Sequence, residues 1–173
     1  MRSDRQEIGQ PLHAGGFDAF RDKTLEQKVQ ELVDREEIRE LIACYAHRIA
    51  RGISVADLFT EDGAFFVRAP GRPLHEIRTR EALEEMYASV QPDDEHPLPM
   101  IHNYQLAIDG DEAIGLCSNE LRISVTGESI IASGYYEDIY RRVNGHWKFA
   151  RRDTTFFHWV PIQEGWALPA KPK

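Results

Sequence analysis

Apolar residues recur every three or four positions over residues 25–49, which predicts a long amphipathic helix with one face against a core. Thr24 precedes this segment and Gln27 follows three residues later, so the two form a capping box at its start. The wholly charged stretch 34–37 indicates a break into two helices, and Gly52 ends the pattern. A second amphipathic helix is expected over residues 80–90, with Thr79 as its N-cap.

The pattern changes to strands from residue 64 onward. Residues 64–67 read as a short strand, and four longer strand-like segments cover 100–109, 112–125, 128–143 and 146–160. Tight turns separate the four, and Asn144-Gly145 is the strongest hairpin signal. Strands of this length usually bend, and Gly115 and Gly134 are natural places for it. Helices segregated from an antiparallel meander predict an α+β domain whose curved sheet encloses a pocket.

These boundaries predict a flexible arm over residues 1–23, one domain over 24–162 and a C-terminal tail over 163–173. Lys and Arg number 21 against 29 Asp and Glu, so the net charge is −8 and no basic cluster favours nucleic acid. No apolar run approaches the ~18 residues of a membrane span, and the N-terminus lacks the apolar core of a secretory signal. We therefore expect a cytoplasmic protein without a membrane or nucleic-acid partner.

Cys44 and Cys117 are the only cysteines, and each lies in an apolar stretch. Neither has a second Cys or a His at the spacing of a zinc site, so no metal is expected. Both are predicted to be small buried hydrophobic residues in a reducing compartment.

Four segments resemble a known family: IRELIACYA at 38–46, LFTEDGA at 58–64, GYYEDIYRR at 134–142 and NGHWKFARR at 144–152. Together they resemble the SnoaL-like group of the nuclear-transport-factor-two-like superfamily, over about residues 25–160. The resemblance implies a cone-shaped α+β fold with a strongly curved antiparallel sheet. That fold hosts dehydratases, isomerases, polyketide cyclases, dehydrochlorinases and non-catalytic binding proteins, so it does not by itself define a function.

The resemblance also implies candidate catalytic residues. Dehydratase and dehydrochlorinase members resemble one another in an Asp–His pair, and His102 in the segment MIHN matches the His. The matching Asp would lie five residues after Tyr45, where this chain has Ala50. Tyr45 matches the Tyr of ketosteroid-isomerase-like members, which donates a hydrogen bond to the substrate oxygen. The general base of that second pattern would fall near Arg68, which cannot accept a proton.

Strand alternation places His102 on one face with Met100, Tyr104, Leu106 and Ile108. An imidazole in an apolar cavity stays neutral near pH 7 and can remove a proton from carbon or oxygen. Tyr45 lies on the buried helix stripe, where its hydroxyl can polarise a carbonyl. For both residues, the alternative interpretation is an ordinary core side chain.

Three carboxylates on the long strands are candidates to replace the missing Asp: Glu120, Asp138 and Asp153. Glu120 shares a face with Arg122 and can form a solvated pair, whereas Asp138 alternates with tyrosines. The sequence alone does not choose among them. Besides Tyr45 and His102, the predicted pocket lining is Tyr104, Glu120, Tyr136 and Asp138.

The leading hypothesis is a cofactor-free lyase or isomerase of the dehydratase or cyclase type, acting on an apolar cyclic ligand. His102 would be its base and Tyr45 its hydrogen-bond donor. The alternative is a non-catalytic ligand-binding or assembly domain, like the β subunits of aromatic-ring dioxygenases, and Ala50 favours it. The resemblance and the apolar faces of residues 112–125 also predict a homodimer or homotrimer.

Overall fold

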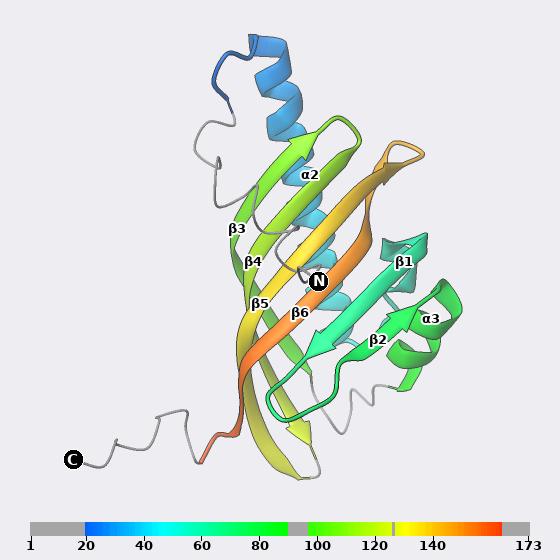
Figure 1. The fold of residues 1–173 in the computed structure, drawn as a ribbon, viewed down its shortest axis with the longest axis vertical. Helices are drawn as coiled ribbons and strands as arrows, with labels where there is room; N and C mark the ends of the chain where they lie inside the picture. The colour runs from blue at the N-terminus through cyan, green and yellow to red at the C-terminus, as the bar shows by residue number, and fades with distance from the viewer. Residues whose placement is uncertain (1–19, 90–96, 126, 164–173) are drawn as a thin grey trace, which may run out of the picture.

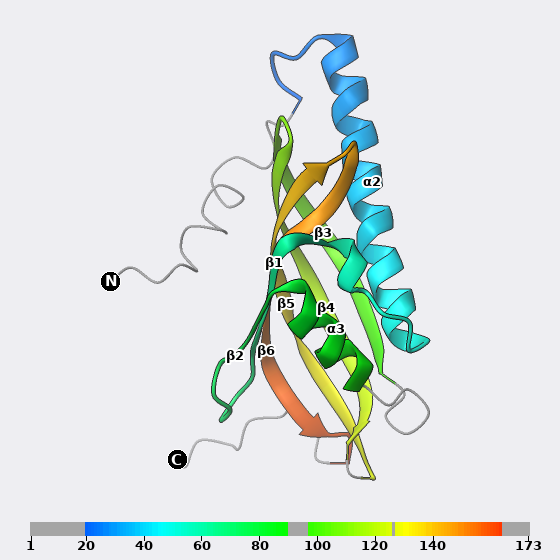
Figure 2. The same cartoon turned by 90° about the vertical axis from the view of Figure 1, so that its right-hand side faces the viewer.

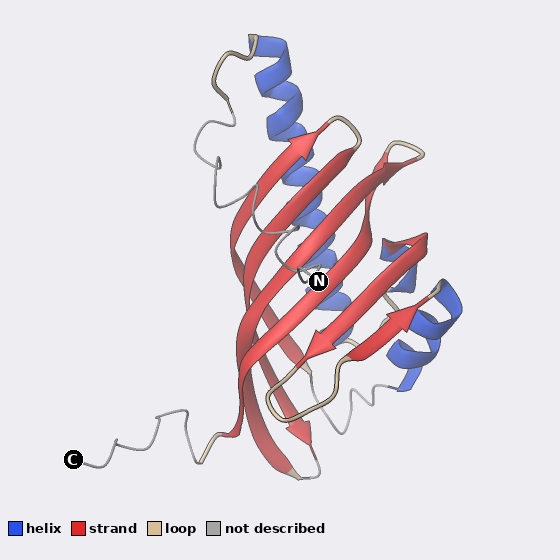
Figure 3. Ribbon diagram, viewed as in Figure 1, coloured by secondary structure: helices blue, strands red, loops and turns tan. Residues whose placement is uncertain are grey.

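A computed structural model describes residues 20–89, 97–125 and 127–163. Its elements, in chain order, are α2 (Leu25–Ala50), a short 3₁₀ helix (Ala56–Leu58), β1 (Phe59–Arg68), β2 (His75–Arg78), α3 (Arg80–Ser89), β3 (Leu98–Asp109), β4 (Glu112–Val125), β5 (Glu128–Val143) and β6 (His146–Pro161). The six strands form one sheet in the order β2-β1-β6-β5-β4-β3 (Figures 1 and 3). Neighbouring strands are antiparallel except β1 and β6, which are parallel. The predicted α+β class and meander are confirmed.

Both helices lie on one side of the curved sheet (Figure 2). The central strands β5 and β6 have 16 residues each, and both twist strongly along their length (Figure 1). Side chains from α2, α3 and the concave face of the sheet form one buried cluster. This arrangement leaves space between the helices and the sheet, which is where the candidate site lies.

The start of α2 has the predicted capping box. The backbone N–H of Gln27 donates to Thr24 Oγ1 at 3.2 Å, and the backbone N–H of Thr24 donates to Gln27 Oε1 at 2.9 Å. The predicted break at residues 34–37 is wrong, because the helix is continuous from Leu25 to Ala50. Ion pairs compensate the charges of this stretch. Arg35 pairs with Glu31 at 2.6 Å, and Asp34 pairs with Arg142 of β5 at 2.6 Å.

Only the C-terminal half of α2 buries its apolar stripe, through Ile38, Leu41, Ile42 and Tyr45. In the N-terminal half the apolar residues Leu25, Val29, Leu32 and Val33 are exposed. The buried positions there are Glu31 and Asp34, which face basic side chains. The prediction of one buried stripe along the whole helix is therefore correct only for its second half.

Two strand features differ from the sequence prediction. β1 begins at Phe59 rather than at residue 64, and β2 was not predicted. β2 has four residues, of which only Ile77 is buried, so it lacks an alternating signal. Most of the predicted N-terminal arm and C-terminal tail lies outside the described residues. No helix among the described residues is long and apolar enough to cross a membrane.

The two predicted bend glycines have different structural roles. At Gly134 the register between β5 and β6 shifts, and an added Cβ would lie 1.8 Å from the carbonyl oxygen of Thr155. At Gly115 the register is continuous, and an added Cβ would lie 2.7 Å from the ring of Tyr140. Gly134 therefore permits a bulge, whereas Gly115 makes room for an aromatic ring.

We expect Gly134→Ala to lower the free energy of unfolding by at least about 2 kcal/mol, because the methyl group would overlap a backbone oxygen that cannot move independently. Urea unfolding followed by circular dichroism measures this difference. Ser133→Ala on the neighbouring residue is the control and should change stability by less than about 0.5 kcal/mol. An unchanged urea midpoint for Gly134→Ala would contradict the account of this bulge.

Candidate functional site

A cavity of about 190 Å³ lies between the two helices and the concave face of the sheet. Its walls are mostly aliphatic and aromatic, with contributions from α2, α3 and strands β1, β3, β4, β5 and β6. The hydroxyl-bearing side chains that line it are Tyr45, Tyr87, Tyr136 and Thr154. No Asp, Glu, His, Lys, Arg or Cys is among its described lining residues. Wider and more open hollows lie elsewhere on the described surface. One of them, of about 680 Å³, lies between β2 and α3. Another, of about 550 Å³, lies between α2 and the β3–β4 turn and is lined mostly by charged and polar side chains.

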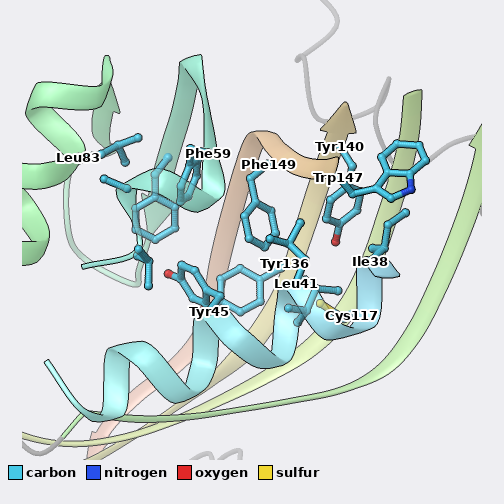
Figure 4. Close-up of a cluster of buried hydrophobic side chains, with 14 of the residues drawn as sticks. Ile38, Leu41, Tyr45, Phe59, Leu83, Cys117, Tyr136, Tyr140, Trp147 and Phe149 are labelled. Carbon is cyan, nitrogen blue, oxygen red and sulfur yellow. The ribbon is translucent and has the colours of Figure 1, made fainter. Parts of the chain in front are cut away.

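Tyrosine hydroxyls meet at the inner wall of the cavity. The hydroxyls of Tyr45 on α2 and Tyr87 on α3 are 3.0 Å apart and share a hydrogen bond. Tyr45 also packs edge-on against Tyr136 and Phe149, with ring centroids 6.4 and 5.7 Å apart (Figure 4). Burial raises the pKa of Tyr45, and it raises the pKa of Tyr87 and Tyr136 well above the usual value. These phenols therefore stay protonated and act as hydrogen-bond donors rather than as bases.

A buried cation supports the tyrosines from the sheet side. The Arg152 guanidinium is fully buried and lies 4.2 Å from the ring centroid of Tyr45 and 3.8 Å from that of Tyr136. Its Nη2 donates to Asp138 Oδ2 at 3.2 Å, and the Tyr140 hydroxyl donates to the same oxygen at 2.8 Å. The cation is thus held by one carboxylate and by aromatic ring faces.

The charge state of Asp138 depends on two opposing effects. Burial raises the pKa of this carboxyl to about 6, and the neighbouring Arg152 opposes the rise. Asp138 is not among the residues that line the cavity. It is therefore the counter-ion of Arg152 and not a base facing a ligand.

Cys117 lies on the same inner face and is buried, with 2% of its surface exposed. Burial raises the pKa of its thiol to about 12, so the reactive thiolate is almost absent at neutral pH.

In a Cys44→Ser variant, in which Cys117 is the single thiol, we expect Ellman's reagent at about pH 8 to react at least about 100-fold more slowly with native than with denatured protein. Equal rates would show that Cys117 is accessible as a nucleophile.

The structure places His102 away from the cavity. Its side chain is exposed, because the register of β3 against β4 shifts between His102 and Gln105. Asn103 within this bulge has a positive φ of 60°. The alternation that we expected from Met100 through Tyr104 to Ile108 is therefore wrong, since the bulge reverses it between His102 and Tyr104. Pro99 is the β3 residue that lines the cavity instead.

Of the other predicted lining residues, only one lines the cavity. Tyr136 lines the cavity, as expected alongside Tyr45. Tyr104 is half-buried against the core, and its hydroxyl donates to the Ile101 carbonyl at 2.6 Å rather than lining the cavity. Glu120 pairs with Arg122 at 3.1 Å and does not line the cavity, which is the solvated alternative considered from the sequence.

Asp153 is buried on the opposite face of β6 from Arg152. It pairs with Arg68 of β1 and with Arg151, the latter at 2.5 Å. The carboxylates considered as partners for His102 therefore have other, cationic partners. None of these carboxylates lines the cavity.

Arg152 and Thr154 were not predicted from the sequence to face the core, because β6 contains a bulge. Ile139 pairs with Arg151 and Tyr140 pairs with Phe149, so Ala150 is extra. Alternation from Phe149 predicts Arg151 on the inner face, but the extra residue turns Arg152 inward instead. A bulge of this kind leaves no signal in the hydrophobic pattern. Tyr87, in contrast, lies on the predicted apolar face of α3 and could have been found.

Metal ligation has no support in the described part of the chain, where no three His, Cys, Asp or Glu side chains are close enough to share an ion. The chemistry available at the cavity is therefore hydrogen bonding from phenol and threonine hydroxyls within an apolar enclosure.

Solved structures share this fold. A protein of unknown function from Mycobacterium tuberculosis is 26% identical, with a TM-score of 0.64 and coverage of 73% of each chain. An NTF2-like protein with a cystatin-like fold from Novosphingobium aromaticivorans is 22% identical, with a TM-score of 0.62 over 79% of this chain and 92% of that chain. A hexachlorocyclohexane dehydrochlorinase from Novosphingobium barchaimii is 17% identical, with a TM-score of 0.66 over 82% of this chain and 99% of that chain.

No curated protein matches this chain significantly. A family model described as a SnoaL-like domain matches residues 30–153, which include α2 from its second turn onward, α3, β1 to β5 and the part of β6 that carries Arg152. The same stretch supplies the tyrosines of the cavity and the buried ion pair beneath them. The chain therefore belongs to the SnoaL-like domain family, with the curved NTF2-like sheet that its resemblance implied.

Proposed function

We propose that this protein binds a small, neutral, apolar cyclic molecule in the cavity between α2, α3 and the sheet. The observation that carries the proposal is the cavity itself, about 190 Å³ in volume with predominantly apolar walls. An apolar protein cavity of about 150 Å³ stays dry and can hold benzene, so this space suits a single ring with few substituents. Ligand sites of this kind are concave and apolar, with a few polar groups that set orientation.

The same geometry favours binding over acid–base catalysis. Proton abstraction requires a group that can accept a proton within hydrogen-bond reach of the ligand. The described lining residues include no such group, and His102 lies on the exposed face of β3. The non-catalytic alternative considered from the sequence is therefore the better-supported function.

A cofactor-free lyase or isomerase is the second candidate. The hydrogen-bonded hydroxyls of Tyr45 and Tyr87 favour it, because protonated phenols can stabilise negative charge that develops on a substrate oxygen. The likeness to a dehydrochlorinase agrees with this candidate at the level of fold. Such a reaction would depend on Tyr45 and not on His102.

Titration of the protein with benzene, followed by NMR, tests the proposal. We expect saturable shifts of resonances from cavity residues and a rise in the melting temperature, because a ligand that binds only the folded state stabilises it. His102→Ala should bind benzene as the wild type does and should melt within about 1 °C of it, since this side chain is exposed. Absence of saturation in the wild type would refute the proposal, and loss of binding in His102→Ala would restore His102 to the site.

Self-association as a homodimer or homotrimer stays a prediction. The outer face of the sheet carries Phe157, which is 59% exposed and packs at a tilt against Tyr135 with ring centroids 5.3 Å apart. Exposed aromatic groups of this kind are common at contact surfaces.

A further inference from the structure

Thr154 differs from the other residues that line the cavity. It lies on β6, is only 1% exposed, and its hydroxyl has no hydrogen-bond partner within the described part of the chain. A hydroxyl that is buried without a partner is unfavourable, so native structures rarely keep one without a role. Tyr45 and Tyr87, in contrast, satisfy each other.

The neighbours of Thr154 place its side chain against the cavity. Its register partners are Tyr136 on β5 and Val67 on β1, and both also line the cavity. Rotation of a threonine about χ1 by one rotamer can move its hydroxyl into the position that its methyl group held before. The Thr154 hydroxyl can therefore turn toward a ligand without movement of the backbone.

We propose that Thr154 selects ligands that carry a hydroxyl or carbonyl oxygen on the ring, by forming a hydrogen bond to that oxygen. The inference rests on the proposed binding function and adds the chemical class of the ligand, a neutral oxygenated monocycle. A neutral group is required because the nearby cation, Arg152, already has Asp138 as its counter-ion. An anionic ligand in this apolar enclosure would lack a partner for its charge.

Other unpartnered buried groups do not suit this role. Neither the Asn119 amide nor the Trp147 indole belongs to a residue that lines the cavity, although both lack a hydrogen-bond partner among the described residues. Thr155 follows Thr154 directly, and strand alternation directs it to the opposite face of the sheet. Thr155→Val is therefore a matched control for Thr154→Val, because the same hydroxyl is removed one residue away.

The test compares the dissociation constants of phenol and benzene for the wild type, Thr154→Val and Thr155→Val, measured by NMR titration. The readout is the ratio of the benzene constant to the phenol constant. We expect Thr154→Val to lower this ratio by about 10-fold, because one hydrogen bond to the phenol oxygen is lost. Thr155→Val should leave the ratio as in the wild type.

The outcomes separate the inference from the binding function on which it rests. If both probes saturate the cavity and Thr154→Val leaves the ratio unchanged, the cavity binds rings but Thr154 does not select them, and the inference is overturned. An equal fall of the ratio in both valine variants would also overturn it. If neither probe saturates the wild type, the binding proposal and this inference fail together. Urea unfolding of Thr154→Val should show wild-type stability or more, which excludes misfolding as the cause of a changed ratio.

Discussion

Arg152→Met is expected to lower the free energy of unfolding by about 3–5 kcal/mol at neutral pH. Methionine fills much of the same space, so the loss reports the missing charge rather than a cavity. Without Arg152, the carboxylate of Asp138 is buried with only the Tyr140 hydroxyl as a described partner, and the rings of Tyr45 and Tyr136 lose their cation. Chemical denaturation of the variant and the wild type measures the difference.

The loss of stability in Arg152→Met should increase as the pH rises. Burial already raises the pKa of Asp138 to about 6, and Arg152 is the charge that lowers it, so the variant should have a higher value. A carboxyl whose pKa is raised by folding stabilises the protein at low pH, and that stability is lost as the pH rises through the raised pKa. The destabilisation by Arg152→Met should therefore be smaller at about pH 5 than at about pH 8.

A second variant identifies Asp138 as the titrating group. Arg152→Met with Asp138→Asn removes both charges while keeping a polar partner for Tyr140, and replacement of a complete buried pair is often nearly neutral. We expect this double variant to recover much of the stability and to lose the pH dependence. If the single variant is as stable as the wild type at about pH 8, the ion pair does not have the structural role assigned to it.

Leu121→Trp is expected to weaken benzene binding by more than about 100-fold, equivalent to about 2.8 kcal/mol. Leu121 lines the cavity from β4, and an indole at this position would occupy the space that the ligand needs. The protein should remain folded, with a stability change of about 1–3 kcal/mol at most. NMR titration gives the affinity, and urea unfolding gives the stability.

Arg122→Trp is the matched control for this variant. Arg122 is the next residue along β4, with an exposed side chain on the other face of the strand, so the same indole is added outside the cavity. Benzene should bind this control as it binds the wild type. Equal binding by Leu121→Trp and the wild type would locate the ligand elsewhere.

The fold could be predicted from the sequence because its signals are local. Helix spacing, the Thr24 capping box and the Asn144-Gly145 turn each depend on residues close together in the chain. The exposed apolar half of α2 could not be predicted, because the periodic pattern does not show where the sheet ends beside the helix. The same limit applies to β2, which is too short to alternate.

The site was predicted only in part, because strand alternation fails at bulges. Tyr45 and Tyr136 lie in uninterrupted segments, and both line the cavity. His102 lies beside one bulge and Arg152 beside another. Two-residue alternation therefore assigns each side chain to the wrong face of the sheet. An additional backbone residue changes the direction of every side chain after it, while the composition of the strand stays the same.

The cavity between α2, α3 and the sheet should hold the ligand. A crystal of the protein soaked with 4-iodophenol locates that ligand, because anomalous scattering reveals the position of the iodine atom. We expect an iodine peak among Tyr45, Leu121 and Trp159, with the phenol oxygen within hydrogen-bond distance of Thr154 Oγ1. Iodine peaks confined to the outer surface, with an empty cavity, would place the ligand site elsewhere.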